Sequence, residues 1–190
     1  MKLVILESGA KARTIKKYLG KGWIVDACNG HVQDLPSGRK NKDSSKAMWT
    51  SKPGELPQPP WSWTERAERI MSKITSKAEK SGVDEVYIAT DPDREGEFIA
   101  WRLSEILSNF DSVKRVSFNE ITKEAVTTSI SNPQELDMDL VDAAIVRRLM
   151  DRLVGFRCSK FCRSWKLKSM GRVQTPTLGY IVEKEIERDA

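Results

Sequence analysis

The chain has 190 residues, of which 39% are hydrophobic, and a formal net charge of +5 at neutral pH. This length and apolar content favour one folded core with a smaller second unit and exclude general disorder. No apolar run reaches the roughly 18–20 residues of a membrane span, and the apolar stretch after Met1 is too short for a signal peptide. We therefore expect a cytoplasmic protein with no membrane partner.

Short apolar runs alternate with amphipathic segments through the first two thirds of the chain. The run Leu3–Leu6 is continuously apolar, as expected for a strand covered on both faces, and residues 11–19 then have helical periodicity. Such alternation predicts an α/β fold with a mostly parallel sheet flanked by helices. The further predicted strands are 23–27, 85–89 and 113–118, and the further predicted helices are 64–81, 95–109 and 122–130.

Two regions depart from this alternation. Residues 36–63 carry five prolines with many Ser and Lys and are predicted to form a long loop. In the last third of the chain the pattern is wholly helical, with helices predicted at 139–154 and 173–189. The sequence therefore predicts two domains, residues 1–134 and a small all-helical segment, residues 135–190.

The helical segment contains a strongly basic stretch. Between Arg147 and Arg172 there are nine basic residues, and Asp151 is the only acidic one. Such a block indicates a polyanionic partner. The alternative, a solvated helix surface, explains the composition equally well.

An acidic run follows the predicted strand 85–89. Asp91, Asp93 and Glu95 are spaced two apart, and side chains two apart in an extended segment point to the same side. Adjacent carboxylates repel one another unless a cation or a proton shares the site. Because the ligands are hard oxygens, the sequence predicts a Mg²⁺ site.

Glu7 ends the first strand, and ligands in open α/β sheets gather beyond the carboxyl ends of strands. If the two strands are neighbours, Glu7 faces Asp91 and should have a raised pKa, which suits a general acid. The alternative for Glu7 is a cap of the next helix. Lys11 could reach a phosphate or these carboxylates, and Arg94 could clamp a phosphate.

Other kinds of site find little support. The three cysteines form no paired Cys-x-x-Cys motif, which argues against a disulfide framework and a zinc ribbon. His31 is the sole histidine and has no evident partner for a Ser-His-Asp mechanism, so it is expected to be a hydrogen-bonding loop residue. No glycine fingerprint of a dinucleotide-binding domain follows the first strand.

Six segments, taken together, resemble the ordered motifs of the type IA DNA topoisomerases. The acidic run is similar to the toprim motif in its topoisomerase form, and the later segments are similar to the entry of the family's helical gate domain. The match is collinear and covers essentially the whole chain. The segments are Glu-Ser-Gly-Ala-Lys at 7–11, Gly-His-Val-Gln-Asp-Leu-Pro at 30–36, Asp-Pro-Asp-Arg-Glu-Gly-Glu at 91–97, Ser-Phe-Asn-Glu-Ile-Thr at 117–122, Arg-Arg at 147–148 with Asp-Arg-Leu-Val-Gly at 151–155, and Gly-Arg-Val-Gln-Thr-Pro at 171–176.

The resemblance implies a Rossmann-like toprim domain and an isomerase that relaxes negatively supercoiled DNA by transient single-strand cleavage through a 5′-phosphotyrosine. Glu7 would protonate the leaving 3′ oxygen, Lys11 would contact the scissile phosphate, and Arg94 would assist at the catalytic site. The Mg²⁺ ligands would be Asp91, Asp93, Glu95 and Glu7. Single-stranded DNA would be held by Arg115, Arg148, Asp151, Arg152, Arg172 and Gln174.

The family's nucleophilic tyrosine is not matched. Tyr18, Tyr87 and Tyr180 are the only tyrosines, and none has the flanking residues of the family motif. We therefore expect a monomeric N-terminal fragment whose missing C-terminal part carries the nucleophile, and which is inactive alone. Two alternatives stay open: a toprim primase or nuclease, which would not explain residues 171–176, and a non-catalytic DNA-binding module whose acidic run only caps a helix.

Overall fold

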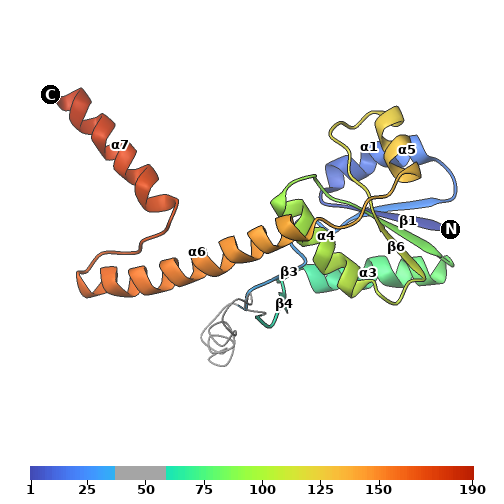
Figure 1. Ribbon diagram of the computed structural model, residues 1–190, viewed down its shortest axis with the longest axis horizontal. Coiled ribbons are helices and arrows are strands. Elements are labelled where there is room, and N and C mark those ends of the chain that lie inside the picture. The colour runs from blue at the N-terminus through green and yellow to red at the C-terminus, as the bar shows by residue number, and fades with distance from the viewer. Residues whose placement is uncertain (37–58) are drawn as a thin grey trace. The chain divides into compact units, whose positions relative to one another are not determined.

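A computed structural model describes residues 1–36 and 59–190, so most of the predicted loop at 36–63 lies outside the described residues. The described chain divides into two compact units, Met1–Ala144 and Ile145–Ala190 (Figure 1). The boundary between the units falls inside the helix Met138–Ser164. It lies later in the chain than the domain boundary that the sequence predicts, which is after residue 134.

The first unit is built on a four-stranded sheet in which every pairing is parallel. The strands, in spatial order, are β2 (Trp23–Ala27), β1 (Lys2–Leu6), β5 (Glu85–Ala89) and β6 (Ser112–Arg115). The predicted parallel sheet is confirmed. Because β1 is central and pairs with β5, the residues that follow these two strands leave the sheet side by side.

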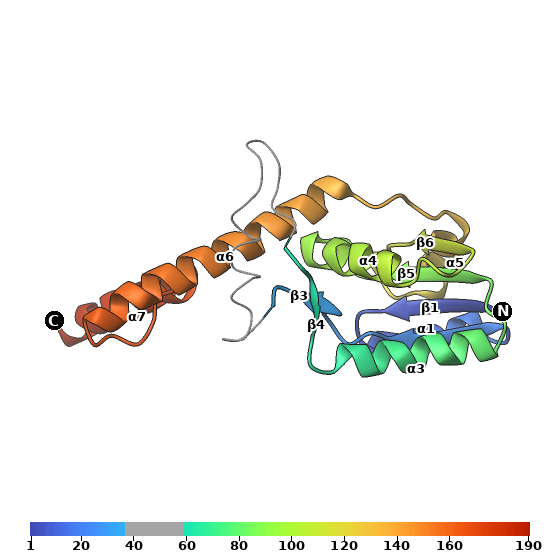
Figure 2. The ribbon, with the colours of Figure 1, turned by 90° about the horizontal axis from the view of Figure 1, so that it is seen from below.

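Helices cover both faces of this sheet (Figure 2). One face carries α1 (Gly9–Leu19) and α5 (Lys123–Ser131), and the other carries α3 (Ala67–Lys80) and α4 (Arg94–Ile106). The predicted α/β class with flanking helices is therefore confirmed.

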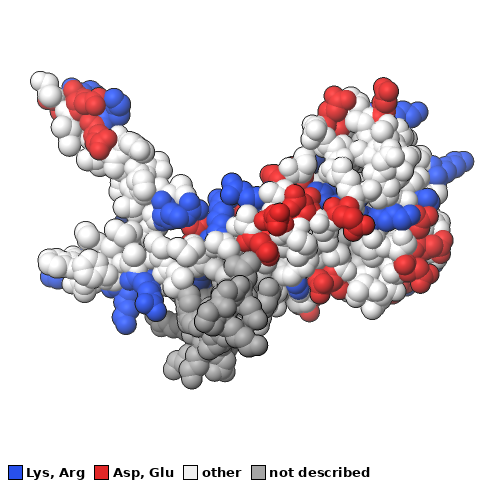
Figure 3. Space-filling view, viewed as in Figure 1, with Lys and Arg blue, Asp and Glu red and all other residues white. Residues whose placement is uncertain are grey.

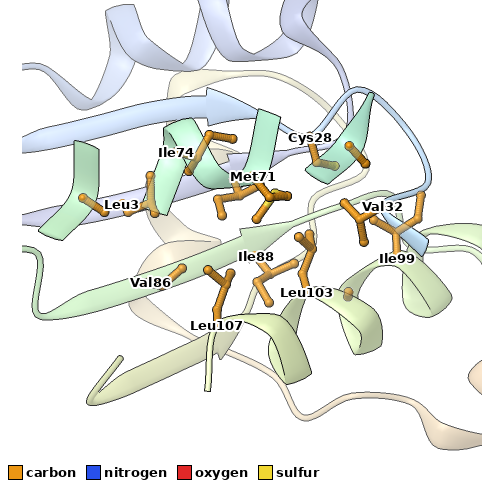
Figure 4. Packing of buried hydrophobic residues seen from close by; sticks show 14 of the residues in the cluster. Leu3, Cys28, Val32, Met71, Ile74, Val86, Ile88, Ile99, Leu103 and Leu107 are labelled. Carbon is orange, nitrogen blue, oxygen red and sulfur yellow. The ribbon is translucent and has the colours of Figure 1, made fainter. Parts of the chain in front are cut away.

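The two faces have separate apolar cores because alternate strand residues point to opposite sides. In β1, Leu3 and Ile5 pack into the core beneath α3 and α4, whereas Val4 and Leu6 pack beneath α1 and α5. Figure 4 shows the first of these cores, with Met71 of α3 among its members. The continuous apolar run that the sequence shows in β1 is thus a strand buried on both faces.

Side-chain caps fix where the two helices nearest the sheet edge begin. Ser8 caps α1 by accepting a hydrogen bond from the Lys11 amide, and Asp93 caps α4 by accepting one from the Gly96 amide. Capping oxygens satisfy amide groups that have no partner inside the helix. As a result α1 and α4 both begin slightly before their predicted starts.

Two predictions in this unit are wrong. The described end of the predicted loop contains a strand, β4 (Ser62–Trp63), which pairs antiparallel with β3 (Gln33–Asp34). Two-residue strands have no periodicity by which a sequence could reveal them. The strand predicted at 113–118 ends at Arg115, whose carbonyl accepts a hydrogen bond from the Gln134 amide of a later segment.

Helix α6 (Met138–Ser164) is longer than the predicted helix at 139–154, and α7 (Gln174–Asp189) follows in the second unit. None of the helices in the described parts of the chain is both long and apolar enough to cross a membrane. The second unit leaves most of its large apolar side chains exposed, unlike the first. They are Val146, Met150, Phe156, Phe161, Trp165, Leu167, Met170, Val173, Leu178, Tyr180, Ile181, Val182 and Ile186.

Candidate functional site

Carboxylates gather at the carboxyl edge of the sheet, where β1 and β5 end. Leu6 is paired with Ala89, so Glu7 leaves β1 beside the segment that leads to Asp91. The condition on which the sequence analysis placed Glu7 beside Asp91, that these two strands are neighbours, is therefore met.

The pKa of the Glu7 carboxyl reflects this position. Burial raises the pKa of the Glu7 carboxyl above its usual value, and the charge of Asp91 raises it further. Asp93 and Glu95 act in the same direction, whereas the ammonium group of Lys11 opposes them. The predicted rise in the Glu7 pKa is confirmed, although burial is the first cause and the neighbouring carboxylates the second. A carboxyl that holds its proton more tightly is suited to donate it to a leaving group.

Lys11 and Asp91 form an ion pair across the edge between α1 and the acidic loop. A cavity of about 410 Å³ opens beside this pair. It is lined by Lys11, Asp91, Pro92, Asp93 and the segment Phe118–Ile121. The prediction from the sequence placed Lys11 near either a phosphate or the carboxylates, and here it contacts a carboxylate.

The three acidic residues of the run do not share one extended segment. Asp93 uses its side chain to cap α4, and the helix begins at Arg94, so Glu95 lies in the first helical turn. Glu95 Oε2 lies 3.1 Å from His31 Nε2. The prediction that all three side chains point the same way along an extended backbone is therefore wrong from Arg94 onward. The prediction that His31 is a hydrogen-bonding loop residue agrees with its contact.

Gly96 is a functional position that sequence reasoning missed. A Cβ atom added there would lie 2.0 Å from the Asp91 carbonyl oxygen. The absent side chain lets the first turn of α4 press against the acidic loop, and Thr90 Oγ1 donates a hydrogen bond to the Gly96 carbonyl at 2.7 Å. A glycine inside a helix is unfavourable by itself, which was the available signal that a close approach requires it.

Arg115 does not fit its predicted role in DNA binding. Its side chain is only 3% exposed, and its Nη2 lies 2.5 Å from Oε1 of buried Glu97. The same guanidinium donates to the carbonyls of Thr90, at 2.8 Å, and Asp91, at 3.1 Å. That prediction is wrong because the guanidinium faces the interior, where it holds the backbone of the acidic loop.

Glu97, the partner of Arg115, was also missed from the sequence. Its second oxygen accepts from the Asp137 amide at 3.3 Å, just before α6 begins. Its position inside the acidic motif was a signal, but acidity alone does not distinguish a buried partner from a metal ligand. Arg94, by contrast, is exposed on the first turn of α4, where a phosphate is accessible to it.

The oxygen donors suit a hard divalent cation, but they are not arranged as a closed site. Within residues 1–36 and 59–190, no three acidic, histidine or cysteine side chains converge as metal ligands. The reason lies in their present contacts, since Lys11 engages Asp91 and the α4 amide engages Asp93.

The second unit brings two of its predicted DNA-binding residues, Asp151 and Arg172, into contact. Asp151 Oδ1 lies 2.6 Å from Arg172 Nε, and this hydrogen bond is the first cause of the lowered pKa of Asp151. The Arg152 guanidinium lies 5.0 Å from the centre of the Phe156 ring. Arg148 lies on α6 and Gln174 begins α7. Figure 3 shows Lys and Arg side chains projecting from α6.

Cys28 is poorly suited to nucleophilic chemistry in this fold. All three cysteines are free, and burial raises the pKa of Cys28 to about 11. A thiol with so high a pKa is a poor nucleophile at neutral pH.

Comparison with known proteins matches both parts of the chain. Residues 2–121 match the Toprim domain, and residues 135–190 match the DNA topoisomerase family. DNA topoisomerase 1 of Zymomonas mobilis is 43% identical over 198 residues, covering 98% of this chain and 15% of the relative. The Rickettsia bellii protein of the same name is 44% identical, covering 98% of this chain and 23% of the relative. The Streptomyces coelicolor protein is 41% identical, covering 100% and 20%.

A solved structure agrees with these relatives. Full-length topoisomerase I from Thermotoga maritima matches with a TM-score of 0.69 and 34% identity, over 84% of this chain and 26% of that chain. The fold and the edge site thus define a toprim-domain protein. The chain belongs to the Toprim family, and its last part, residues 135–190, is similar to the DNA topoisomerase family. It spans between 15% and 23% of the length of the three relatives above.

Proposed function

We propose that this chain supplies the acid and metal-binding half of the active site of an enzyme that relaxes negatively supercoiled DNA by transient single-strand cleavage. The observation that carries the proposal is the pairing of β1 with β5, which puts protonatable Glu7 beside Asp91 and Asp93. The collinear topoisomerase matches support the same reading.

Toprim domains bind a divalent metal ion, and we propose Mg²⁺ here because the available donors are carboxylate oxygens. Asp91 and Asp93 would hold it, with Glu95 and Glu7 at hand. When bound, Mg²⁺ supplies positive charge that offsets the carboxylates and a DNA phosphate. Glu7 gives its proton to the leaving 3′ oxygen, which its raised pKa favours.

Two cations complete the proposed phosphate site. Lys11 reaches the acidic loop, as its ion pair with Asp91 demonstrates, and contacts the scissile phosphate. Arg94 is exposed at the start of α4, directly after Asp93, and takes a second phosphate oxygen. The cavity between Lys11 and residues 118–121 offers room for this part of the strand.

The second unit is proposed to hold single-stranded DNA. We assign residues 1–134 to the toprim domain and 135–190 to the beginning of the helical DNA-binding domain. Phosphate contacts by arginines produce binding that weakens with salt and depends little on sequence. The contacting residues would be Arg148, Asp151, Arg152, Arg172 and Gln174, with Asp151 orienting Arg172 through their ion pair.

The nucleophile is proposed to come from outside these 190 residues. Tyr18 donates to the Ile121 carbonyl at 3.2 Å, and Tyr87 donates to Glu85 at 2.8 Å. Both phenols are therefore engaged in structural contacts far from a role in cleavage. Tyr180 is exposed on α7 but lacks the flanking residues of the family motif.

Activity assays test this proposal and its alternatives together. The purified chain is expected not to relax supercoiled DNA, and relaxation by the chain alone would contradict the proposed origin of the nucleophile. Metal-dependent nicking by the chain would instead favour the nuclease alternative, and nucleotide polymerisation would favour the primase alternative.

Binding to a labelled single strand tests the second unit. We expect binding at low salt that weakens in Arg148→Gln and Arg172→Gln variants. The control is Lys184→Gln, which removes an exposed cation of α7 that already pairs with Glu187 at 2.5 Å. If the native chain, the two arginine variants and the control all bound the single strand with equal affinity, these arginines would not be DNA-binding residues.

A further inference from the structure

One face of α4 runs away from the acidic loop, and beyond Glu95 it carries residues that the proposed active site does not use. Glu95, Phe98 and Arg102 lie three and four residues apart, so they share this face. Trp101 lies beside Arg102, and Trp61 packs against both. We propose that Arg102, Trp101 and Trp61 form a subsite for one nucleotide of single-stranded DNA, with the guanidinium on the phosphate and the indole rings beside the base.

Arg102 is a cation without a matching anion. Its Nε donates to the amide oxygen of Gln33 at 2.8 Å, and its Nη2 contacts the same oxygen. No carboxylate lies within ion-pair distance of it among the residues that the structure describes. Burial lowers the pKa of Arg102, and the charge of Glu105 only partly offsets this. A partly dehydrated guanidinium bonded to a neutral amide gains strongly from an added phosphate oxygen.

Arg115, in the same domain, is an arginine whose charge is paired with a carboxylate, and it serves as a comparison for Arg102. It is nearly fully buried and bonded both to the Glu97 carboxylate and to backbone carbonyls. Arg102 is half-buried and lacks any such carboxylate among the described residues. The structural need that explains Arg115 therefore does not explain the charge of Arg102.

The aromatic residues around Arg102 resemble a stacking surface more than a closed core. The guanidinium carbon lies 4.6 Å from the Trp101 ring centre and 5.7 Å from that of Trp61. The two indoles meet edge to face, with centres 5.9 Å apart and planes at 87°. Phe98 is buried beneath them, whereas both indoles keep exposed surface. Aromatic rings and arginine planes are the groups on which proteins stack single-stranded bases.

The position of the cluster suits the same DNA strand. His31 joins it to the acidic loop, because His31 lies 3.1 Å from Glu95 and its ring centre lies 5.9 Å from that of Phe98. Arg102 is seven residues beyond Glu95 along α4, which is about 10 Å at 1.5 Å per residue. Phosphates recur about every 3.4 Å along a stacked strand. The subsite would then hold a nucleotide roughly three positions from the scissile phosphate.

This inference rests on the proposed function, since it presumes a single strand at the acidic loop. The test measures the affinity of the chain for a fluorescein-labelled oligothymidylate over a range of salt concentrations. The variants are Arg102→Gln and Trp61→Phe, with Arg102→Lys retaining the charge. The matched control is Lys77→Gln, which removes a cation from α3 that pairs with Asp26 at 2.8 Å.

We expect Arg102→Gln to weaken binding about tenfold and to reduce the slope of log affinity against log salt by about 0.7, the value for one phosphate on a single strand. Lys77→Gln should change neither quantity, and Arg102→Lys should keep the slope. A purely structural role for Arg102 would alter the unfolding midpoint without altering the salt slope. Near-ultraviolet circular dichroism of each variant verifies its fold, and Trp61→Phe tests the stacking surface if Arg102→Gln does not fold.

Unchanged affinity and slope in both Arg102→Gln and Trp61→Phe would overturn the subsite, as would a native chain that binds no oligonucleotide at low salt. Mg²⁺ titration of the same proteins separates the two proposals. Unchanged oligonucleotide affinity in the variants, together with intact Mg²⁺ binding by the native chain, counts against this inference alone, whereas a native chain that binds no Mg²⁺ counts against the proposed active site.

Discussion

The two ends of the parallel sheet both carry carboxylates, yet they are electrostatic opposites. At the amino end, Glu85 lies between Lys2 of β1, at 3.0 Å, and Lys114 of β6, at 2.6 Å. Their hydrogen bonds, with one from Tyr87, lower the pKa of Glu85 to about 2. At the carboxyl end, Glu7 is partly buried beside Asp91, and its pKa is raised.

The difference identifies which end is structural and which is functional. At the amino end each carboxylate has cations on neighbouring strands, so the charges join three strands of the sheet. At the carboxyl end the carboxylates of Glu7, Asp91, Asp93 and Glu95 face Lys11 and His31, which leaves a surplus of negative charge. Surplus negative charge at this edge is unfavourable until a cation or a proton binds. Unbalanced charge of this kind is typical of functional sites and not of purely structural parts of a fold.

The largest expected effect on the free energy of unfolding comes from substituting Arg115 of β6. Its neighbour Lys114 contacts Glu85 at the amino end of the sheet, whereas Arg115 contacts the acidic loop at the carboxyl end. Arg115→Met leaves Glu97 buried without its cation and should lower the free energy of unfolding by about 3–5 kcal/mol. Lys114→Met removes only an exposed partner of Glu85 and should have a far smaller effect. Urea unfolding of the two variants at neutral pH measures both. Equal destabilisation by the two substitutions would contradict the assignment of Arg115 to the interior.

The next effect concerns the contact between α4 and the acidic loop. Gly96→Ala places a methyl group against the Asp91 backbone and should destabilise the fold by about 1–3 kcal/mol, despite the better helix propensity of Ala. The matched control is Gly179→Ala in α7, where nothing lies within 4 Å of the added carbon. The control should be neutral or stabilising by up to about 1 kcal/mol. If Gly96→Ala stabilised the fold, the first turn of α4 could not lie as close to the Asp91 backbone as described.

The pH dependence of stability should have opposite signs at the two ends. A raised pKa means that folded Glu7 holds its proton more tightly than the unfolded chain does. Its contribution is therefore fully present below the ordinary value of 4.5 and is lost as pH rises through the folded pKa. Glu7→Gln should gain stability relative to the native chain as pH increases from 4 toward 7. Urea midpoints across that range measure the gain, and a difference that does not change with pH would exclude a raised pKa.

The smallest expected effect is at Glu85, whose side chain is partly exposed. Its lowered pKa stabilises the fold above 4.5, and this contribution is lost as pH falls toward the folded value of about 2. Glu85→Gln should therefore be slightly less stable than the native chain at neutral pH and equal to it near pH 2. If the stability difference between Glu85→Gln and the native chain grew as pH fell, the charge of Glu85 would not be balanced by the neighbouring lysines.

Much of the first unit could be predicted because its signals are local. Apolar runs such as Leu3–Leu6 and the helical periodicities determine the elements, and strand–helix alternation determines a parallel sheet. The proximity of Glu7 and Asp91 followed from that topology, since parallel strands end at one edge. Residues that depend on tertiary contacts could not be recognised in this way.

Arg115 and Glu97 illustrate the limit. A strand-end arginine and an acid within an acidic motif look like ligand-binding groups until the fold shows that they bury each other. The same limit hid the Asp93 cap, which starts α4 early enough to take Glu95 out of the extended run. In each case the deciding interaction joins residues whose spacing in sequence carries no periodic signal.

The central claim is that the carboxyl edge binds a divalent cation and the amino edge does not. Calorimetric titration of Mg²⁺ into the native chain, an Asp91→Asn, Asp93→Asn double variant and a Glu85→Gln control tests it most directly, with a single-stranded oligonucleotide present and absent. We predict saturable binding to the native chain and the control, and a loss of at least about tenfold in affinity in the double variant. Binding that is unchanged in the double variant, or lost equally in Glu85→Gln, would contradict the account.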